Sequence, residues 1–385
     1  MIALQLGREA RVAYAEIEAL ATEFNYTINT LENGVVYIEP KNNFPGVQQL
    51  VSRSGGIVRG FNLLDETEEE DLVELMVKKY PKEKITFGVS TINSDRSAEG
   101  FAGAIKKILK GKNISARFVV PKHDEDQLNT GSLTHNDLDC EVIVTTFNGK
   151  KRLGLTTGFQ DSEAWGFFDY EKPIRDPRRG MLPPKLARTM INLLGFPIEN
   201  KKILDPFCGL GTVSIEALRL NANTVASDAD PNAIEGTKEN LAWAKKVLTT
   251  DREITIMQCD AREIGKRLKT KVDGIVCETF LGIPNNLTIA QRKEEAAQLE
   301  KLYVDCLKGW KKILEKNARV VMAIPQFHVR DEIVSVTIEN NLARLGYTLN
   351  KPLENKVLLS QNGNLLYRRE KQTVGREILI LTYNG

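Results

Sequence analysis

The sequence contains few of the residues that build metal sites and disulfide frameworks. It has five cysteines and three histidines among 385 residues, and the cysteines form no C-x-x-C pair. An odd number of such cysteines gives no sign of a disulfide framework or a zinc site, and so few histidines argue against a histidine metal centre or proton relay. We therefore expect no bound metal, and we expect most thiols to be buried and reduced.

Long apolar runs and a strong net charge are also missing. No apolar run approaches the roughly 20 residues that cross a bilayer, and Met1–Arg8 lacks the basic-then-apolar order of a signal peptide. We therefore expect a cytoplasmic protein with no membrane partner. The net charge of +2 is too mild to mark a nucleic-acid binder, so local basic clusters would have to provide such binding.

The first 165 residues show a mixed pattern of helices and strands. The spacing of apolar residues predicts a helix over Arg11–Phe24, a hairpin over Thr27–Ile38 that turns at Glu32-Asn33-Gly34, and a strand over Leu50–Phe61. This stretch carries no catalytic signature, and a basic, proline-containing segment follows it. We interpret 1–165 as an α+β region, 166–184 as a linker and 185–385 as a second domain.

Strands and helices alternate from Lys201 onward, which predicts a doubly wound, mostly parallel sheet. A helix is expected over Asp331–Leu345. Two final strands, over Lys356–Ser360 and Glu377–Tyr383, have no helix between them and suggest an antiparallel hairpin at one edge. The predicted fold is therefore a Rossmann-like α/β domain preceded by an α+β region.

The segment Ile203–Ser214, I-L-D-P-F-C-G-L-G-T-V-S, predicts a strand, a glycine turn and a helix. Gly209 and Gly211 allow the backbone to turn tightly and to lie close to a ligand. The loop has serine where G-x-G-x-x-G requires a third glycine, and it lacks the lysine of a phosphate-binding loop. Nicotinamide and nucleoside-triphosphate cofactors therefore fit it poorly.

Four successive predicted strands end in an acid, and in a doubly wound sheet these ends line one crevice. Asp228 is placed to accept hydrogen bonds from ribose hydroxyls, and Asp260 with Ala261 to bind an adenine edge. Asp205 would fix the glycine loop or orient an amino group, and Glu278 is the fourth acid. S-adenosylmethionine carries a ribose, an adenine and an amino group, and it has no phosphate. For each acid alone, a helix cap or turn residue is the alternative.

These motifs resemble those of S-adenosylmethionine-dependent RNA methyltransferases. D-P-F-C-G-L-G-T at 205–212, S-D-A-D-P-N-A-I at 227–234 and C-D-A-R at 259–262 are similar to the first three family motifs. The match is best with tRNA guanine-N(2) methyltransferases that carry a THUMP RNA-binding domain. The segments 175–188 and 367–378 also resemble that family, whereas before residue 165 the resemblance rests on domain placement and on 128–138.

The resemblance implies a cofactor site and an RNA partner. The region 1–165 would hold tRNA or another structured RNA, and the enzyme would reach or flip out a guanine. The need for a partner protein stays open. The residues implied to bind S-adenosylmethionine are Asp205, Phe207, Cys208, Gly209, Gly211, Thr212, Asp228, Ala229, Asp260, Ala261 and Glu278.

Arginines near the domain border and the C-terminal motif are candidates for phosphate contacts. Such contacts give salt-dependent affinity without sequence choice, and for any single arginine a solvated surface position is the alternative. The candidates are Arg175, Arg178, Arg179, Arg368 and Arg369, together with Lys371 and Arg376.

The fourth motif departs from the family, because the usual D/N-P-P-Y reads Glu278-Thr279-Phe280-Leu281. An exocyclic amine is a weak nucleophile, so a site must accept its N–H bonds and direct its lone pair while an aromatic face holds the base. Glu278 retains an acceptor and Phe280 an aromatic ring. We predict Glu278, Phe280 and Leu281 as the catalytic residues.

The predicted function is S-adenosylmethionine-dependent methylation of the exocyclic amino group of a guanine in tRNA. Two alternatives stay open. One is a catalytically inactive RNA-binding relative, in which Thr279–Leu281 only pack beneath the sheet edge. The other is a methylase that acts on another amino group, in DNA or in a protein amide.

Overall fold

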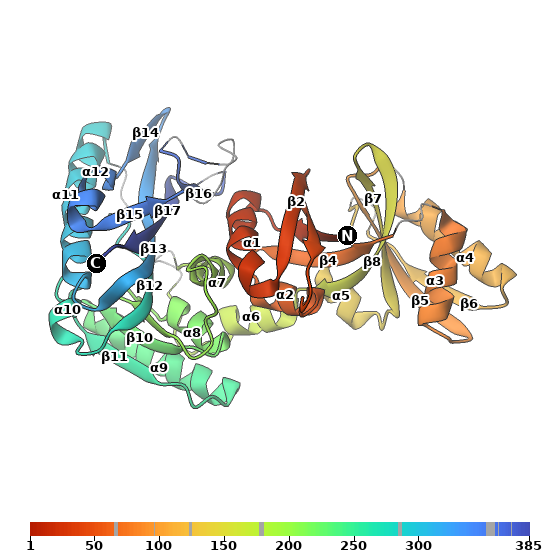
Figure 1. Cartoon of the computed structure of the whole chain (residues 1–385), viewed down its shortest axis with the longest axis horizontal. Helices are drawn as coiled ribbons and strands as arrows, with labels where there is room; N and C mark the ends of the chain where they lie inside the picture. The colour runs from red at the N-terminus through yellow and green to blue at the C-terminus, as the bar shows by residue number, and fades with distance from the viewer. Residues whose placement is uncertain are drawn as a thin grey trace. The chain divides into compact units, whose positions relative to one another are not determined.

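The computed structural model describes the chain except for residues 65–67, 96, 123–124, 177–180, 284–286, 352–358, 361 and 371. It contains two compact units (Figure 1). The first unit comprises Met1–Ala10, Phe24–Arg53 and Ile57–Gly166, and the second comprises Arg11–Glu23, Ser54–Gly56 and Phe167–Gly385. The grouping of 11–23 and 54–56 with the second unit was not anticipated from the sequence.

The first unit is built on an eight-stranded, mostly antiparallel sheet in the order β2-β3-β1-β4-β8-β7-β5-β6, in which β5 pairs in parallel with β6 and β7. Asn33 and Gly34, both with positive φ, form the turn of the expected hairpin. The strands are β1 (Ile2–Leu6), β2 (Tyr26–Glu32), β3 (Val35–Pro40), β4 (Ile57–Leu63), β5 (Lys84–Ile92), β6 (Ser115–Val119), β7 (Cys140–Phe147) and β8 (Lys150–Phe159).

Helices α3 (Glu69–Lys79) and α4 (Ala98–Gly111) cover part of this sheet, because their apolar stripes pack on β5, β7 and β8. The strand expected over Leu50–Phe61 is wrong in its first half. Residues Val47–Arg53 form helix α2, and the strand begins only at Ile57. The short helix α5 (Thr130–His135) and helix α6 (Ser162–Tyr170) complete this part of the chain.

The second unit is built on a sheet in the order β11-β10-β9-β12-β13-β17-β15, which confirms the predicted Rossmann-like α/β fold. The first five of these strands are parallel, and β17 runs antiparallel between β13 and β15. The strands are β9 (Lys202–Asp205), β10 (Asn223–Asp228), β11 (Ile254–Gln258), β12 (Val272–Glu278), β13 (Leu314–Val329), β14 (Glu332–Ser335), β15 (Tyr347–Asn350), β16 (Leu365–Tyr367) and β17 (Val374–Tyr383).

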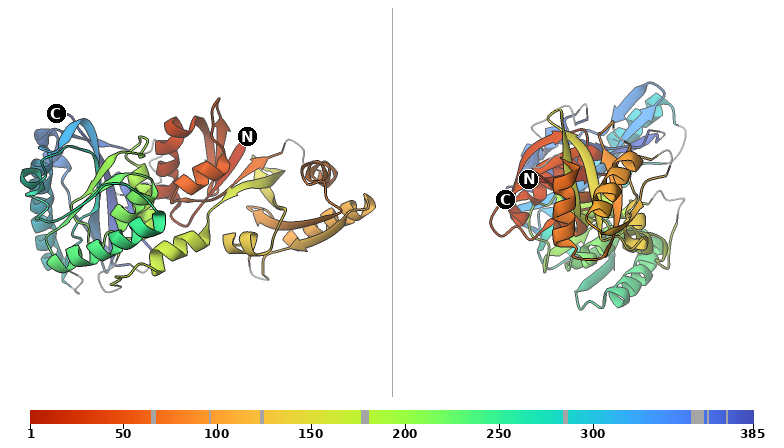
Figure 2. Two further views of the ribbon diagram at one scale, coloured as in Figure 1. Left: turned by 90° about the horizontal axis from the view of Figure 1, so that it is seen from below. Right: turned by 90° about the vertical axis from the view of Figure 1, so that its right-hand side faces the viewer.

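Helices cover both faces of this second sheet (Figures 1 and 2). Apolar residues of α10 (Ile264–Arg267), α11 (Ile289–Trp310) and α12 (Glu339–Leu342) pack on one face. On the other face lie α1 (Ala10–Phe24), α7 (Pro184–Asn192), α8 (Thr212–Arg219) and α9 (Pro231–Leu248). The sheet is therefore buried on both sides, as its apolar parallel strands require.

The C-terminal part contains one wrong expectation. The stretch Asp331–Leu345 is not one helix: it forms β14, α12 and a 3-10 turn, because Val334 pairs with Phe327 in a hairpin with β13. Most of the strand expected over Lys356–Ser360 lies outside the described residues. Antiparallel pairing at one edge is present, and the edge strand is β15. Among the described residues, no helix is long and apolar enough to span a bilayer.

Candidate functional site

Three of the predicted acids meet at one edge of the second sheet. Strand β9 lies between β10 and β12, with Asp205 paired to Ala226 and Leu204 paired to Ile275. Asp205, Asp228 and Glu278 end these three neighbouring strands. The order also changes direction at β9, and ligands bind at this kind of point in an open α/β sheet.

The glycine turn after β9 leaves open space where a ligand would lie. Gly209 and Gly211 have φ of 52° and 85°, in the left-handed region that favours glycine. A Cβ atom on Gly209 would have no neighbour within 4 Å. The Gly209 N–H donates to Oδ2 of Asp228 at 2.9 Å, and the Gly211 N–H to the Cys208 carbonyl at 2.7 Å. The loop therefore has a fixed backbone, with open space beside Gly209.

Helix α9 holds this loop from behind through two fully buried side chains. Thr237 Oγ1 donates to the Gly209 carbonyl at 2.8 Å, and Asn240 Nδ2 donates to the Leu210 carbonyl at 2.9 Å. Asn240 also accepts from the backbone N–H of Ile174 at 2.9 Å. The segment that precedes the domain is thus tied to the loop.

Asp205 has strongly unfavourable surroundings for its charge. Its side chain is buried, and burial raises its pKa well above the ordinary value. The N–H of Phe207, which donates to Oδ1 at 3.1 Å, opposes this increase, whereas the charges of Asp228 and Glu278 add to it. A crevice with three acids attracts a cationic ligand and repels phosphate groups.

Asp260 and Ala261 follow β11, next to β10, and the Asp260 carboxylate and the Ala261 carbonyl each already have a partner. The Arg262 guanidinium donates to the Asp260 carboxylate from Nε at 3.0 and 3.1 Å, and this bond lowers the pKa of Asp260. The Ala261 carbonyl accepts from Trp310 Nε1 at 2.9 Å. An adenine edge at this position would share the carboxylate with Arg262.

The other residues implied to bind the cofactor surround the loop. Phe207 is half-buried, Thr212 opens α8, and Ala229 is exposed just after β10. Cys208 is buried, and burial raises the pKa of its thiol, so it acts as a small loop residue and not as a nucleophile. All five cysteines are free and buried.

Glu278 is held by an arginine that the sequence suggested only as a phosphate contact. Arg376 Nε donates to Glu278 Oε1, and the Arg376 guanidinium lies 6.0 Å from the Tyr367 ring centre. Burial raises the pKa of Glu278, and the charge of Arg376 opposes that increase. The partners are 98 residues apart in sequence. They meet because Ala323 of β13 pairs with both Glu278 and Ile378.

The remainder of the fourth motif has a fixed backbone and one exposed ring. Thr279 donates to the Ala323 carbonyl from its N–H at 3.1 Å and from Oγ1 at 2.9 Å. The Tyr303 hydroxyl donates to the Phe280 carbonyl at 2.6 Å. The Phe280 side chain is nevertheless 52% exposed, and Leu281 is half-buried. Thr279 packs beneath the sheet edge, whereas Phe280 does not.

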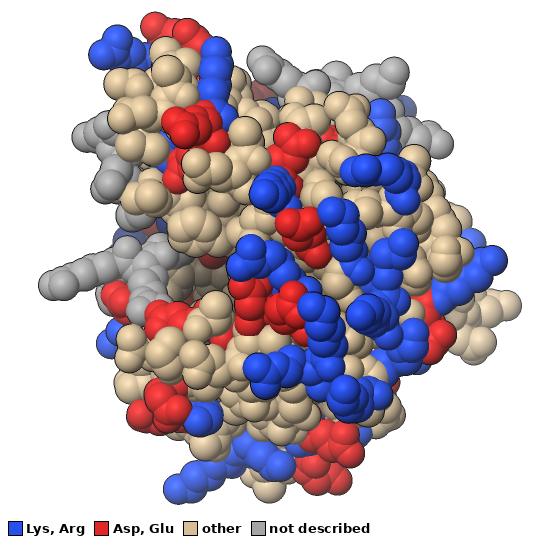
Figure 3. Space-filling view, turned by 90° about the vertical axis from the view of Figure 1, so that its left-hand side faces the viewer, with Lys and Arg blue, Asp and Glu red and all other residues tan. Residues whose placement is uncertain are grey.

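The predicted phosphate contacts differ in their surroundings. Arg175 and Arg369 are exposed, whereas Arg368 is half-buried and donates from Nε to the Gln372 carbonyl at 2.9 Å. Arg178, Arg179 and Lys371 lie outside the described residues. Lys and Arg side chains that the sequence analysis did not single out also gather on the face that Figure 3 shows, and exposed cations near α10 are Lys266, Arg267, Lys269 and Lys271.

The chain is similar in sequence to known methyltransferases. Residues 174–339 match a family described as an RMKL-like methyltransferase domain. The tRNA (guanine(10)-N2)-dimethyltransferase of Methanothermobacter thermautotrophicus is 36% identical over 162 residues, which are 42% of this chain and 44% of that protein. The protein of the same description from Methanocaldococcus jannaschii is 26% identical over 341 residues, 83% of this chain and 90% of the relative.

A solved structure has the same fold. The crystal structure of TrmN from Thermus thermophilus superposes with a TM-score of 0.52 and 16% sequence identity, and the alignment covers the whole of both chains. The similarity in sequence spans less than half of the first relative and nine-tenths of the second. Together these comparisons confirm the predicted fold class and the resemblance to tRNA guanine-N(2) methyltransferases, whereas the THUMP assignment of the first 165 residues stays a prediction.

Proposed function

We propose that this chain methylates the exocyclic amino group of a guanine in tRNA with S-adenosylmethionine. The premise is that residues 174–339 match a methyltransferase domain. The observation that supports this most is the pairing of a restrained acid with an exposed ring. Glu278 and Phe280 stand at the end of β12, and that strand is beside the glycine loop.

The acids at this sheet edge fit S-adenosylmethionine by charge, and the glycine loop leaves space beside them. The sulfonium and amino groups of the cofactor are cationic and would be stabilised by Asp205 and Asp228, and the open space at Gly209 leaves room for the bound molecule. Asp228 accepts from Gly209 and Asp230, but a carboxylate has about four acceptor positions, so it retains capacity for ribose hydroxyls. When bound, this cofactor supplies an electrophilic methyl group.

Glu278 would act on the guanine amine. Its carboxylate accepts an amine N–H, which turns the nitrogen lone pair toward the methyl carbon. Glu278 would stabilise the positive charge that the nitrogen gains when it takes up the methyl group, and it would receive the proton that leaves, a role favoured by its raised pKa. Arg376 keeps the carboxylate in one orientation throughout.

Phe280 and Thr279 complete the site in place of the family's two prolines and tyrosine. The exposed Phe280 ring offers a face on which a flipped guanine stacks. The two hydrogen bonds of Thr279 to Ala323 restrain the backbone that proline rings would otherwise stiffen. Leu281 follows Phe280 in the chain and is half-buried. An exposed Phe280 ring next to a restrained Glu278 is therefore better explained by an active enzyme than by an inactive relative.

RNA binding is the second part of the proposal. The first unit would hold the structured part of the tRNA, and the exposed Arg175 and Arg369 would contact its phosphates. Such contacts position the RNA without reading its sequence, so the choice of guanine would depend on the site at Glu278.

The test has two stages. Calorimetry should detect S-adenosylmethionine binding to the purified chain, and absence of binding would overturn the cofactor assignment. Transfer of labelled methyl into bulk tRNA should then fall about 100-fold in Glu278→Ala, because an acceptor in the transition state is lost. Glu294→Ala, an exposed position on α11, is the control. Transfer that is unchanged in Glu278→Ala would refute the role of Glu278.

A further inference from the structure

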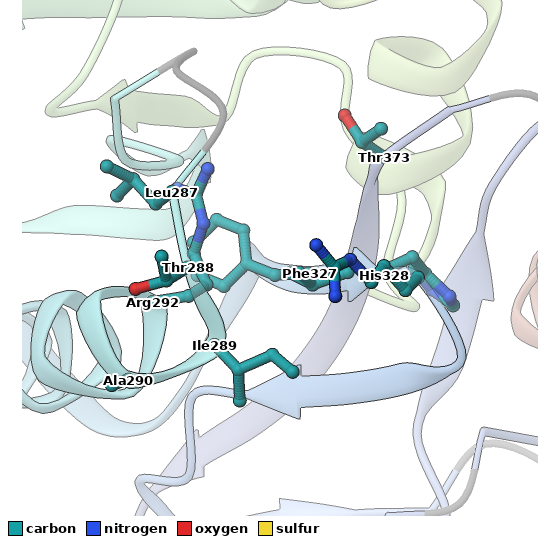
Figure 4. A pocket seen from close by; sticks show the side chains of 10 residues that line it. Leu287, Thr288, Ile289, Ala290, Arg292, Phe327, His328 and Thr373 are labelled. Atoms are coloured by element: carbon teal, nitrogen blue, oxygen red, sulfur yellow. The ribbon is translucent and has the colours of Figure 1, made fainter.

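A pocket of about 600 Å³ opens next to the fourth motif, between the first turn of α11 and the end of β13. In Figure 4, Ile289 and Ala290 come from the helix, Thr288 from the residue that caps it, and Phe327 and His328 from the strand. The volume lies in the range of sites for small ligands, roughly 300–1,000 Å³. None of the residues that line this pocket has a role in the proposed function.

Residues that follow the fourth motif along the chain contact the residues that line the pocket. Arg292 donates to the Ile283 carbonyl at 3.2 Å and lies 4.4 Å from the Phe327 ring centre, and a Cβ on Gly282 would lie 3.1 Å from that ring. Phe327 follows Ala323, the partner of Glu278, along β13 by about 13 Å. The segment that carries Phe280 therefore continues into the wall of the pocket.

The charge at the rim of the pocket is opposite to that of the cofactor crevice. The described lining residues include no aspartate or glutamate and two arginines, of which Arg292 forms an ion pair with Glu295. Arg330 is exposed at the rim. Ile289 and Val329 add apolar surface. A ligand with a negative group and a flat apolar part fits this combination.

Arg330 has an uncommon backbone conformation for its residue type. It lies in the two-residue turn between β13 and β14, where Val329 pairs with Glu332, and its φ is 53°. Glycine and asparagine adopt this left-handed conformation at lower cost. The turn therefore holds the Arg330 backbone in a conformation that arginine adopts at some cost.

His328 is fixed by bonds on two sides. Its backbone N–H donates to the Thr373 carbonyl at 2.7 Å, and its Nε2 lies 3.0 Å from Oε1 of Gln326. Gln326 donates through Nε2 to Glu377 at 3.1 Å, so its Oε1 accepts from His328. Nδ1 of His328 is then the ring's acceptor. Burial lowers the pKa of His328, which keeps the ring neutral at neutral pH.

We propose that this pocket holds a nucleotide that neighbours the target guanine in the same RNA, with its phosphate at Arg330 and its base between Ile289 and His328. The inference rests on the proposed function and extends it from one base to a second contact point. A fixed neighbour would position the target guanine at Glu278 and contribute to the choice of guanine.

A bulky substitution tests the pocket without removing a charge. Ala290→Trp would fill it from an exposed position on α11, and Ala297→Trp makes the same change at another exposed position of that helix. Ultraviolet cross-linking to bulk tRNA, followed by peptide mass spectrometry, should link a nucleotide to the His328 peptide in the wild type and in Ala297→Trp. We expect Ala290→Trp to lose this link and to raise KM for tRNA about tenfold, with S-adenosylmethionine binding unchanged.

Arg330→Asn removes the cation and keeps a residue that tolerates the left-handed turn. Lys316→Asn makes the same charge change at an exposed position near the start of the same strand. We expect Arg330→Asn to keep its melting temperature and to lower the slope of log affinity for tRNA against log salt by about 0.7–0.9, the loss of one phosphate contact. Lys316→Asn should leave the slope unchanged.

The outcomes separate this inference from the proposed function. If the wild type transfers methyl groups and both Ala290→Trp and Arg330→Asn match it in cross-linking and in tRNA affinity, the pocket assignment is overturned and the function stands. A pocket that cross-links free uridine 5′-monophosphate but not tRNA would also overturn it. Failure of cofactor binding would refute the function, whereas the cross-link at His328 is measured without methyl transfer.

Discussion

At the scale of single residues, the proposed site depends on Glu278, and the sequence does not indicate that Arg376 binds this acid. The sequence shows that Glu278 ends a strand and stands where the family has aspartate or asparagine. It gives no sign that Arg376 binds this carboxylate, because the two meet only through their common neighbour β13. The extra methylene of glutamate adds freedom, and the guanidinium removes it.

Arg376→Gln should therefore impair catalysis more than cofactor binding. We expect kcat to fall roughly 10- to 100-fold because the carboxylate is no longer oriented. The guanidinium also lowers the pKa of Glu278, so its removal should move the acidic limb of the pH–kcat profile to higher pH. Arg369→Gln, on the exposed side of the same motif, should leave the profile in place. An unchanged acidic limb in Arg376→Gln would contradict the positioning role.

Asp205→Asn should stabilise the cofactor-free chain while abolishing cofactor binding. The folded-state pKa of Asp205 lies above its unfolded value, so its ionisation disfavours folding. This cost is absent below the ordinary carboxyl range and is complete above the raised pKa. The substitution should thus raise the unfolding free energy at pH 8 by about 1–3 kcal/mol and have little effect near pH 4.

Thermal melts at both pH values test this prediction, with the exposed Asp251→Asn as the control. Asparagine at position 205 keeps an oxygen that accepts the Phe207 N–H, so the substitution does not remove this hydrogen bond. A lower melting temperature for Asp205→Asn at pH 8 would contradict the account of Asp205.

At the scale of elements, the glycine loop was predictable and its neighbours were not. The strand, the turn glycines and the helix could be identified from Ile203–Ser214 because each has a local cause. The wrong helix over Asp331–Leu345 has a tertiary cause, since β14 exists only by pairing with β13. The restraint of Thr279 and the exposure of Phe280 also depend on β13 and α11, so spacing along the chain does not reveal them.

A matched pair of substitutions isolates the function of the loop from its conformation. Gly209→Ala and Gly34→Ala both place a side chain at positive φ, and neither Cβ meets an atom within 4 Å. Each should lower stability by about 1–2 kcal/mol. Only Gly209→Ala should weaken S-adenosylmethionine binding, by tenfold or more in calorimetry, because its methyl group enters the cofactor space. Equal affinities in the two variants would argue against this cofactor position.

At the scale of the molecule, the alternation of strands and helices predicted the sheet of the second unit, but the sequence did not show how the chain divides into its two units. Residues 11–23 and 54–56 group with the second unit through Glu16, which is fully buried. Its carboxylate accepts from Ser54 Oγ at 2.6 Å, from the Gly55 N–H at 2.8 Å and from Asn192 Nδ2 at 2.6 Å. These contacts link segments that are distant in sequence.

Glu16→Ala should therefore destabilise the second unit although it lies far from Glu278 in the chain. The buried donors of Ser54, Gly55 and Asn192 would lose their acceptor, which we expect to lower the unfolding free energy by about 3 kcal/mol. Urea unfolding followed by tryptophan fluorescence measures this, with Glu294→Ala as the control. A midpoint equal to that of the wild type would show that Glu16 does not hold these segments together.

The central claim is that the acid crevice, Glu278 and Phe280 together methylate guanine in tRNA. The most direct measurement incubates the full chain with bulk tRNA and isotopically labelled S-adenosylmethionine, digests the RNA to nucleosides and identifies the labelled product by mass spectrometry. We predict label in guanosine methylated on its exocyclic nitrogen, and loss of that label in Glu278→Ala. Label in another nucleoside, or RNA without label although the cofactor binds, would contradict the account.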